Sequence, residues 1–314
     1  MSDTTEYLVE QLTPDFGFYL RSARRIVDVR SRYQRIEVFD NALFGRAMRI
    51  DGCFMTSERD EFFYHENMVH VPAVTHAAPA SGLVVGGGDG GAAEELLKHA
   101  SMRRVVMAEL DAEVVSVARA HLGAIHNGAF DDPRLELVIG DAKAYVERCA
   151  ERFDQIVLDL TDPFGPAQPL YTEAFYAACK RILNPGGLLS LHMQSPVTHP
   201  RAFHRIYCSV RSVFATVRPM LVYVPLYGTW WGMAVASEGI DPLALPEGEV
   251  DRRIAERALR NLRFYNGATH HAVMALPNFV REIVARFDGP LSPDEQLGEV
   301  VDPATLPPLL LRPA

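Results

Sequence analysis

The sequence contains no apolar run long enough to cross a membrane and no sign of a secretory leader. None of its hydrophobic stretches approaches the roughly 18 residues that a transmembrane helix needs. Its first residues, MSDTTEYLVEQ, lack the basic start and the apolar stretch that are typical of a signal peptide. We therefore expect a cytoplasmic protein that does not bind membranes.

Cysteine is scarce, and histidine forms no known metal-binding motif. The four cysteines are scattered along the chain, without a pair at the spacing of metal ligands. The 11 histidines include no HExxH sequence, and His270 and His271 are adjacent rather than one helical turn apart. These observations predict reduced thiols and no metal site.

Basic residues are in deficit, with 31 lysines and arginines against 40 aspartates and glutamates and a formal net charge of −9. Such a balance argues against nucleic acid as a partner and is compatible with a cationic small molecule. Hydrophobic residues make up 48% of the 314 residues, which is ordinary for a globular protein with a sizeable core. The length allows one large domain with a smaller one attached.

The first quarter of the chain has the pattern of a small β domain followed by a helix. The stretches IVDVRS, YQRIEVFD and RAMRIDG place apolar residues at every second position, which predicts short strands between Gly17 and Arg49. The stretch SERDEFFYHENMVHVPAVTH then changes to a helical period. Ser57 and Asp60 resemble a capping box at the start of that helix. We assign residues 1–75 to this domain and its linking helix.

From Gly82 the pattern alternates between strands and helices. The expected strands are GLVVG, RVVMAEL, LELVIGD, FDQIVLDL and LLSLHM, and the helical stretches between them are AAEELLKH, DAEVVSVARAHL, AKAYVERCAE and TEAFYAACKRIL. This order predicts βαβ units and a mostly parallel sheet with helices on both faces. We assign residues 76–314 to this α/β domain. It includes a helical segment after Glu247 and a tail rich in proline and leucine from Asp302, for which we predict no structure.

The loop after the first of these strands combines glycines with an acid. In LVVGGGDGGAAEELLKH, Gly86, Gly88 and Gly91 have the G-x-G-x-x-G spacing of a nucleotide-binding loop. In dinucleotide-binding proteins a pyrophosphate lies against this loop, and here it would face Asp89. Two like charges about 4 Å apart repel by roughly 4 kcal/mol at an effective dielectric near 20. The loop therefore suits a nucleoside that carries a cation, such as the amine or sulfonium of an S-adenosyl compound.

Further acids end the strands that follow. Glu109 ends the second strand, where an acid accepts hydrogen bonds from both ribose hydroxyls. Asp141 ends the third strand and is placed to meet the adenine, and Asp159 ends the fourth, with Asp162 three residues later. Ligands of open α/β sheets bind beyond the carboxyl ends of the strands, so we expect these acids to share one crevice. We interpret Asp111, by contrast, as the cap of the next helix.

Together these motifs resemble the polyamine aminopropyltransferases, the spermidine synthase family. The matching stretches are GGGDGG, AELD, FDDPRLELVIGDA, DLTDPFGPAQPLYTEAFYAACKRILNPGG, SRYQRIEVFDNALFGRAMRIDG, TSERDEFFYHE and FYNGATHHAVMALP, so the resemblance covers roughly residues 17 to 285. It implies a small N-terminal β domain on a Rossmann-like, methyltransferase-type domain. It also implies transfer of the aminopropyl group of decarboxylated S-adenosylmethionine to a di- or polyamine such as putrescine, with release of 5'-methylthioadenosine.

The resemblance further implies roles for individual residues. Asp159 would be the catalytic acid–base residue, assisted by Tyr64. Asp162, His192 and Tyr227 would contact the acceptor amine. Members of the family are commonly dimers or tetramers, so the resemblance also implies a homodimer or a homotetramer. The residues expected to hold the donor are Gln34, His65, Gly86, Gly88, Asp89, Glu109, Asp141 and Ala142.

The chemistry of such a transfer gives an independent reason for an acid at the reacting centre. The leaving group departs as a neutral thioether, whereas an alkylamine with a pKa near 10.4 is less than about 0.1% free base at pH 7. An acid must therefore accept the proton of the amine and orient its lone pair, and Asp159 at a rigid strand end is the best candidate. This scheme needs no metal and no cofactor, because the decarboxylated donor is a co-substrate.

The chain departs from the usual pattern of the family on the expected acceptor side. Met55 and His192 each stand where a glutamine is usual. The stretch LYGTWWGM introduces Trp230 and Trp231, which either pack in the core or a subunit contact or stack on an amine. The stretch DLTDP resembles branches that accept agmatine or longer polyamines. The sequence therefore does not decide whether the acceptor is putrescine, agmatine, spermidine or another longer amine.

Two other functions stay open on the sequence alone. An S-adenosylmethionine-dependent methyl or aminocarboxypropyl transferase would need a basic partner for the carboxylate of its donor. No basic residue stands between Gly86 and Glu95, although a distant arginine can fold in. The other alternative is a relative that keeps the fold only to bind a ligand or act as a scaffold, and the presence of both Asp159 and Asp162 argues against it.

Overall fold

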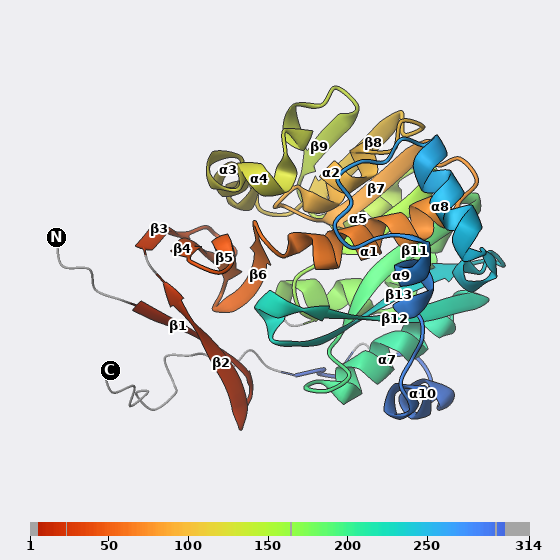
Figure 1. Ribbon diagram of the computed structural model, residues 1–314. Helices are drawn as coiled ribbons and strands as arrows, with labels where there is room; N and C mark the ends of the chain where they lie inside the picture. Colours follow the sequence, from red (N-terminus) through yellow and green to blue (C-terminus); the bar gives the residue numbers. More distant parts are fainter. Residues whose placement is uncertain (1–5, 23, 164, 293, 299–314) are drawn as a thin grey trace.

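The N-terminal part consists of two small antiparallel sheets (Figure 1). The computed structural model describes residues 6–298 except 23, 164 and 293. Strands β1 (Glu6–Thr13) and β2 (Phe16–Ser22) form a hairpin that projects from the rest of the molecule. A four-stranded sheet follows in chain order, with β3 (Arg24–Arg30), β4 (Arg35–Asn41), β5 (Gly45–Ile50) and β6 (Cys53–Ser57). A small apolar core joins the two sheets through Leu8, Phe39, Phe44, Ala47, Phe54 and Leu226.

The larger part is a seven-stranded sheet in the order β12-β13-β11-β10-β7-β8-β9. The pairs from β11 to β9 are parallel, and β13 pairs antiparallel with both β11 and β12. The chain runs outward from β7 to β9 and then returns to β10 beside β7, so the topological switch point lies between β7 and β10. The strands are β7 (Ser81–Gly86), β8 (Arg104–Glu109), β9 (Leu135–Ile139), β10 (Phe153–Asp159), β11 (Leu183–Gln194), β12 (Thr216–Val224) and β13 (Thr229–Ser237).

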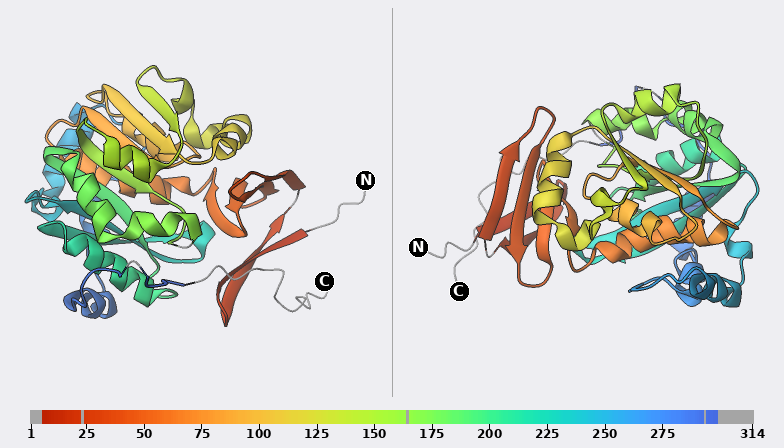
Figure 2. Two further views of the ribbon diagram at one scale, coloured as in Figure 1. Left: turned by 180° about the vertical axis from the view of Figure 1, so that it is seen from behind. Right: turned by 90° about the horizontal axis from the view of Figure 1, so that it is seen from above.

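Helices cover both faces of this sheet (Figure 2). Two large apolar cores lie on the two faces, one beneath α1, α2, α3 and α8 and the other beneath α5, α6, α7 and α10. The bounds of the helices are α1 (Glu61–Thr75), α2 (Gly91–Leu97), α3 (Ala112–His121), α4 (Gly123–His126), α5 (Ala142–Arg148), α6 (Glu173–Arg181), α7 (Pro200–Arg211), α8 (Glu247–Glu256), α9 (Gly267–Ala272) and α10 (Asn278–Ala285). Of the helices in the described ranges, none has the length and apolar character that crossing a membrane requires.

Helix α1, which carries Tyr64 and His65, is fixed by polar contacts to the C-terminal segment. Arg253 and Arg257 donate hydrogen bonds to carbonyl oxygens of its last turn and of the two residues that follow it. These are carbonyls that a helix end leaves without intrahelical partners. The buried carboxylate of Glu66 accepts from three successive backbone N–H groups, at residues 263 to 265. The segment after β13 therefore holds a helix that faces the switch point.

Most of the elements predicted from the sequence are confirmed. The sheet is mostly parallel with helices on both faces, the N-terminal part is a small β domain, and Asp111 caps α3 by accepting from the N–H of Glu113 at 3.0 Å. Three strands were not predicted from the sequence, namely β1, β6 and β12. The tail from Asp302 lies outside the described residues.

The capping box expected at α1 is wrong. Asp60, not Ser57, is the N-cap residue, and its side chain makes no capping hydrogen bond. The hydroxyl of Ser57 donates to one oxygen of Asp60, and the other oxygen accepts from the N–H of Leu226 at 2.7 Å. The Asp60 carboxylate therefore ties the start of α1 to the turn before β13.

Candidate active site

A cavity of about 530 Å³ lies where the N-terminal sheets meet the carboxyl ends of β7, β8, β9 and β10. Its volume is in the range of small-molecule sites. All the residues that the sequence predicts for catalysis, donor binding and acceptor binding line it, together with Met55 and Trp231. The predicted residues are Gln34, Tyr64, His65, Gly86, Gly88, Asp89, Glu109, Asp141, Ala142, Asp159, Asp162, His192 and Tyr227.

The glycines of the loop after β7 allow close contact with two site residues. Gly86 has a φ of 80°, and a Cβ at this position would overlap the carbonyl oxygen of Asp159. A Cβ at Gly91 would overlap the imidazole of His65. Asp89 turns one carboxylate oxygen back to the N–H of Gly91 at 3.0 Å. The third glycine of the motif therefore makes room for a histidine, rather than for a phosphate.

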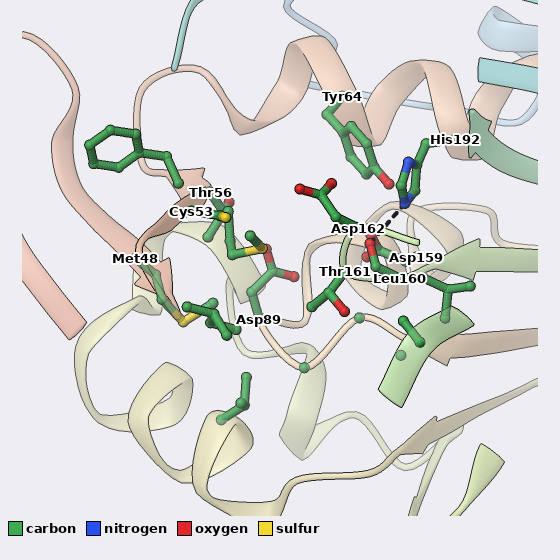
Figure 3. A pocket seen from close by; sticks show the side chains of 18 of the residues that line it. Met48, Cys53, Thr56, Tyr64, Asp89, Asp159, Leu160, Thr161, Asp162 and His192 are labelled. Atoms are coloured by element: carbon green, nitrogen blue, oxygen red, sulfur yellow. Dashed lines mark hydrogen bonds between the residues drawn. The ribbon is translucent and has the colours of Figure 1, made fainter. Parts of the chain in front are cut away.

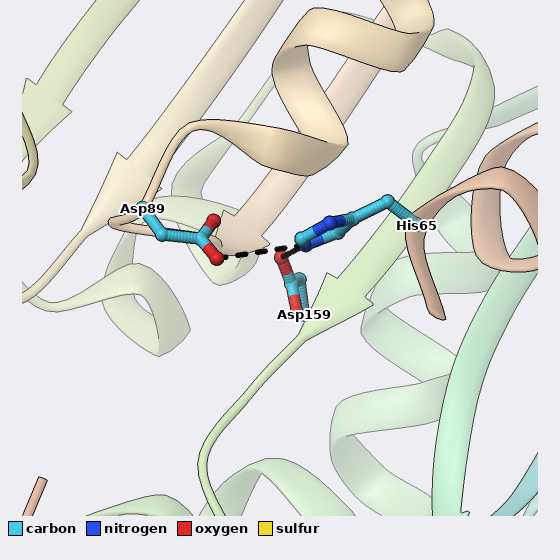
Figure 4. Close-up of side chains that lie close together, drawn as sticks. All are labelled: His65, Asp89 and Asp159. Atoms are coloured by element: carbon cyan, nitrogen blue, oxygen red, sulfur yellow. Dashed lines mark ion pairs between the residues drawn. The ribbon is translucent and has the colours of Figure 1, made fainter. Parts of the chain in front are cut away.

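Three carboxylates surround His65, and two of them, Asp89 and Asp159, face the same ring nitrogen (Figure 4). The Nε2 of His65 is 3.6 Å from Asp89 and 3.8 Å from Asp159, and its Nδ1 is 2.9 Å from Glu61. Burial alone would lower the pKa of His65, but the charge of Asp89 and the hydrogen bond to Glu61 raise it to about 10. The imidazole is therefore a cation at neutral pH and compensates the charge of the acids around it.

Asp159 is the acid at the centre of the cavity. Burial raises its pKa to about 6, against the lowering effects of the His65 charge and of a hydrogen bond from Tyr64. A carboxyl with this pKa is ionised at neutral pH yet accepts a proton more readily than an exposed aspartate. The rigid end of β10 and the backbone bond from Gly87 N–H to the Asp159 carbonyl, 2.8 Å, hold the residue in place.

The chain between Asp159 and Asp162 is held by a buried histidine (Figure 3). The Nε2–H of His192 donates to the carbonyl of Leu160 at 2.9 Å and lies 2.6 Å from the phenol oxygen of Tyr171. That phenol donates to the carbonyl of Thr161 at 2.7 Å. Burial lowers the pKa of His192 to about 4, so the ring is neutral. Its other nitrogen, Nδ1, is buried without a hydrogen-bond partner among the described residues.

Aromatic rings form one wall of the side that is expected to hold the acceptor. Trp231 stacks on His192 with ring centroids 5.6 Å apart, and Tyr227 lies 4.8 Å from Trp231 and 6.2 Å from Tyr64. The Tyr227 phenol donates to the backbone carbonyl of Met55 at 2.7 Å. Trp230, in contrast, is 48% exposed on the outer surface. Only one of the two tryptophans therefore lines the cavity.

The opposite end carries the acids expected to hold a nucleoside. Glu109 accepts the N–H of Asp111 at 2.8 Å, and burial raises its pKa to about 7. Asp141 caps α5 through the N–H of Ala144 and still borders the cavity. Gln34 donates to Asp111 at 3.1 Å. Asp111 is therefore more than a helix cap, because it also joins the β domain to the large sheet.

Among the charged side chains of the lining, acids predominate. Lys143 is the one lysine or arginine among the described lining residues. A cavity of this composition attracts cations and repels phosphates and carboxylates. Its acids are Glu10, Asp51, Asp60, Glu61, Asp89, Glu109, Asp141, Asp159 and Asp162.

Comparisons with known proteins agree with this geometry. The model of the Spermine/spermidine synthase domain matches residues 61–242, and the model of the Spermidine synthase tetramerisation domain matches residues 8–58. The chain belongs to the spermine/spermidine synthase family. The predicted family is thereby confirmed, and the protein is an aminopropyltransferase.

Individual members of the family match over nearly the whole chain. A polyamine aminopropyltransferase of Nitrosomonas europaea is 54% identical over 299 residues, which cover 95% of this chain and 92% of that protein. Polyamine aminopropyltransferase 2 of Hyperthermus butylicus is 41% identical over 280 residues, which cover 88% of this chain and 92% of that protein. A crystal structure of spermidine synthase in complex with the transition-state analogue AdoDATO has a TM-score of 0.85 at 35% identity, covering 91% and 98% of the two chains.

Glu10 also lines the cavity of this aminopropyltransferase, although it was not predicted as a site residue. This residue lies on β1, is buried, and accepts the N–H of Phe54 at 2.7 Å. The pKa of Glu10 is raised to about 8, mainly by burial and also by the charge of Asp162, against the lowering effect of the hydrogen bond from Phe54. A signal was present, because Glu10 stands two residues after Leu8 and therefore faces inward on the same side of the strand.

Proposed function

We propose that this aminopropyltransferase transfers the aminopropyl group of decarboxylated S-adenosylmethionine to a diamine of the putrescine type and releases 5'-methylthioadenosine. One observation carries the proposal. Asp159, a carboxylate with a pKa raised to about 6, shares one cavity with the glycine-loop acid Asp89, which faces the same nitrogen of His65, and with the second acid Asp162. This arrangement supports a cationic donor on one side of a base and a cationic acceptor on the other.

The donor end fits a nucleoside whose far end is positive. Glu109 is placed for ribose hydroxyls, with Gln34, Asp141 and Ala142 around the base. Asp89 then faces the sulfonium and the amine of the aminopropyl group. The same carboxylate would repel a pyrophosphate in this loop by roughly 4 kcal/mol. We therefore assign these residues to the donor.

The reaction is a displacement at the carbon bound to the sulfonium. The lone pair of the acceptor nitrogen forms the new C–N bond while the C–S bond breaks, and its electron pair stays on sulfur as a neutral thioether. The acceptor nitrogen gives up one proton, which Asp159 accepts. Tyr64, hydrogen-bonded to Asp159, orients the carboxylate, and the walls of the cavity hold the nitrogen in line with the bond that breaks.

The acceptor end favours a primary ammonium at the far end of the amine. Glu10 is buried and Asp162 is partly buried there, and the loss of contact with water raises the pKa of Asp162 to about 6 and that of Glu10 to about 8. A substrate ammonium would compensate the charge of Asp162 and would favour the charged form of Glu10. A guanidinium pairs best with a carboxylate that offers both oxygens, but Gln194 already donates to Oδ1 of Asp162. This contact favours a diamine over agmatine.

An amine panel tests the acceptor. The enzyme is incubated with decarboxylated donor and putrescine, agmatine or spermidine, and the products are identified by mass spectrometry. We expect an aminopropylated product from each accepted amine and the highest kcat/KM with putrescine. A higher kcat/KM with agmatine or spermidine would overturn the assignment of the acceptor. A second incubation uses intact S-adenosylmethionine as the donor. A product that gains a methyl or an aminocarboxypropyl group in that incubation, or no product with the decarboxylated donor, would overturn the proposed reaction.

We further propose that turnover needs neither a metal nor an organic cofactor. His65, Asp89 and Asp159 each offer one ligand atom, within 4.8 Å of one another, and could hold a metal ion. The proposed function places the amine of the donor at this cluster instead. Enzyme treated with a chelator is expected to keep its full activity. Loss of activity that an added divalent metal restores would contradict the proposal.

We also propose that the protein assembles as a homodimer or a homotetramer. The match to a tetramerisation domain over residues 8–58 supports this. Three aromatic side chains of the β1–β2 hairpin are exposed and available for burial against another copy, namely Tyr7, Phe16 and Tyr19. Light scattering after gel filtration tests the assembly, and a monomer at micromolar concentration would contradict it.

A further inference from the structure

Strand β11 contains a bulge where it reaches the acceptor side of the cavity. Its register with β13 pairs His192 with Met233 and Gln194 with Gly232, so Met193 is the extra residue. Such bulges occur beside active sites, where they change the direction of a side chain. Gln194 has a φ of 71°, the left-handed region that a residue with a long side chain rarely adopts.

Two neighbours allow this conformation. A Cβ at Gly232 would overlap both the ring of Phe203 and the carbonyl oxygen of Gln194, so the absence of a side chain there makes room for the bulge. The hydroxyl of Ser195 fixes the chain directly after it, by accepting the N–H groups of Val197 and Thr198. Left-handed backbone at a residue other than glycine persists only where the surroundings impose it, and it concentrates at functional sites.

The bulge directs the side chain of Gln194 to Asp162. Gln194 is only 1% exposed, lines the cavity, and donates from Nε2 to Oδ1 of Asp162. An amide can donate to a carboxylate without bringing a positive charge. The contact therefore fixes the orientation of the acid and leaves its negative charge to be compensated by a substrate.

We propose that Gln194 is a positioning residue for the acceptor amine: it holds Asp162 so that Oδ2 receives the ammonium that does not react. This inference rests on the proposed function, because it assigns a task within the same acceptor site. It is not carried by any sequence motif, since residue 194 lies beyond the glycine loop and outside the segment that bears Asp159 and Asp162. Three observations support a special role for Gln194: the bulge directly before it, its left-handed backbone and its contact with Asp162.

Two substitutions separate positioning from a structural role. Gln194→Met keeps the length of the side chain and removes the donor, whereas Gln194→Gly removes the donor and also relieves the left-handed backbone. For both variants we expect the KM for putrescine to rise at least tenfold and kcat to change less than threefold. Binding of 5'-methylthioadenosine, measured by calorimetry, is expected to stay within twofold of the unmodified enzyme. The Tm of Gln194→Gly is expected to equal or exceed that of the unmodified enzyme.

A second buried glutamine provides the matched control. Gln155 is also 1% exposed, but its amide donates to the carbonyl of Val69 between a strand and helix α1, outside the cavity lining. Gln155→Met is expected to lower the Tm and leave the KM for putrescine unchanged.

The inference is overturned if both variants at residue 194 keep the KM of the unmodified enzyme. It is also overturned if they behave like Gln155→Met, with a lower Tm and an unchanged KM. If the unmodified enzyme makes no aminopropylated product, that result alone overturns the proposed function. The variants at residue 194 test only the role of Gln194.

Discussion

The proposed donor end and the proposed acceptor end of the cavity, called the donor end and the acceptor end below, are built from different kinds of sequence. At the donor end, Asp89, Glu109 and Asp141 follow three successive strands, each within one βα unit. At the acceptor end, Glu10 and Gln194 come from β1 and β11, far apart along the chain. Short motifs therefore predict the residues of the donor end. Only the tertiary structure shows that Glu10 and Gln194 belong to the acceptor end.

The two ends also differ in how their charges are balanced. At the donor end the His65 cation lies close to both Asp89 and Asp159. At the acceptor end a neutral amide contacts Asp162, and burial raises the pKa of Asp162 to about 6 and of Glu10 to about 8. A carboxylate removed from water without a cation beside it is costly. Asp162 should therefore gain more from a substrate ammonium than Asp89, which already has the His65 cation nearby.

The largest expected effect is at Asp159, which lies between the two ends. Asp159→Asn keeps the shape of the side chain but cannot accept the proton of the amine, so kcat is expected to fall by about 10² to 10⁴. Affinity for 5'-methylthioadenosine, measured by calorimetry, should change little. The matched variant Asp162→Asn should act mainly on the KM of the amine. Near-normal turnover of Asp159→Asn would remove this residue from the role of base.

The donor end alone should respond to Asp89→Asn. The amide oxygen can still accept the N–H of Gly91, so the loop keeps its shape while the charge is lost. A hydrogen bond to a charged group contributes about 1.5 to 3 kcal/mol, so the Kd for the decarboxylated donor should rise roughly 10- to 100-fold. The KM for putrescine at saturating donor should change less than threefold. An unchanged Kd in calorimetry would contradict the contact of Asp89 with the donor.

The pH dependence of kcat should report Asp159 rather than His65. Burial raises the pKa of Asp159 to about 6, so its protonated form, which cannot act as a base, accumulates as the pH falls through 6. With both substrates saturating, kcat should fall about tenfold for each pH unit below this value. The pKa of His65 is raised to about 10, so this group stays protonated throughout the range. A kcat that is constant from pH 7 to pH 5 would contradict the assignment.

The smallest expected effect is at Glu10 and concerns stability as well as binding. The pKa of Glu10 is about 8 in the folded protein, whereas the ordinary pKa of a glutamate is 4.5. The stability that comes from the bound proton is therefore complete below pH 4.5 and is lost as the pH rises through 8. Glu10→Gln should raise the free energy of unfolding at pH 8.5 by about 1 to 3 kcal/mol and raise the KM for putrescine a few-fold. Lower stability than the unmodified protein at pH 8.5 would contradict this.

Much of the fold and of the donor end follows from local sequence pattern. The βα alternation, the glycine loop and the acids at the strand ends are features of short segments, and the structure brings them to one crevice. The strands β1 and β12 were missed, although each pairs with the strand that follows next in the chain, β2 and β13. In β12 the reason is Pro219, because a proline inside an apolar run argues against a strand unless that strand lies at the edge of a sheet, as β12 does. The capping box at Ser57 was wrong, because a tertiary contact to Leu226 takes the carboxylate of Asp60.

The acceptor end could be predicted only in part. Asp162, His192 and Tyr227 were expected there, and all three line the cavity. Glu10 and Gln194 were not, because an inward-facing glutamate on a distant strand and a glutamine redirected by a bulge carry no motif. Trp230 and Trp231 are neighbours in sequence, yet strand alternation sends one to the surface and the other to the cavity.

The most direct test of the comparison is a crystal structure of the enzyme with 5'-methylthioadenosine and putrescine bound together. We predict the ribose at Glu109, one amine nitrogen within hydrogen-bonding distance of Asp159, and the other at Asp162 beside Gln194. A diamine with both nitrogens away from Asp159, or a nucleoside whose ribose does not meet Glu109, would contradict the division of the cavity into these two ends.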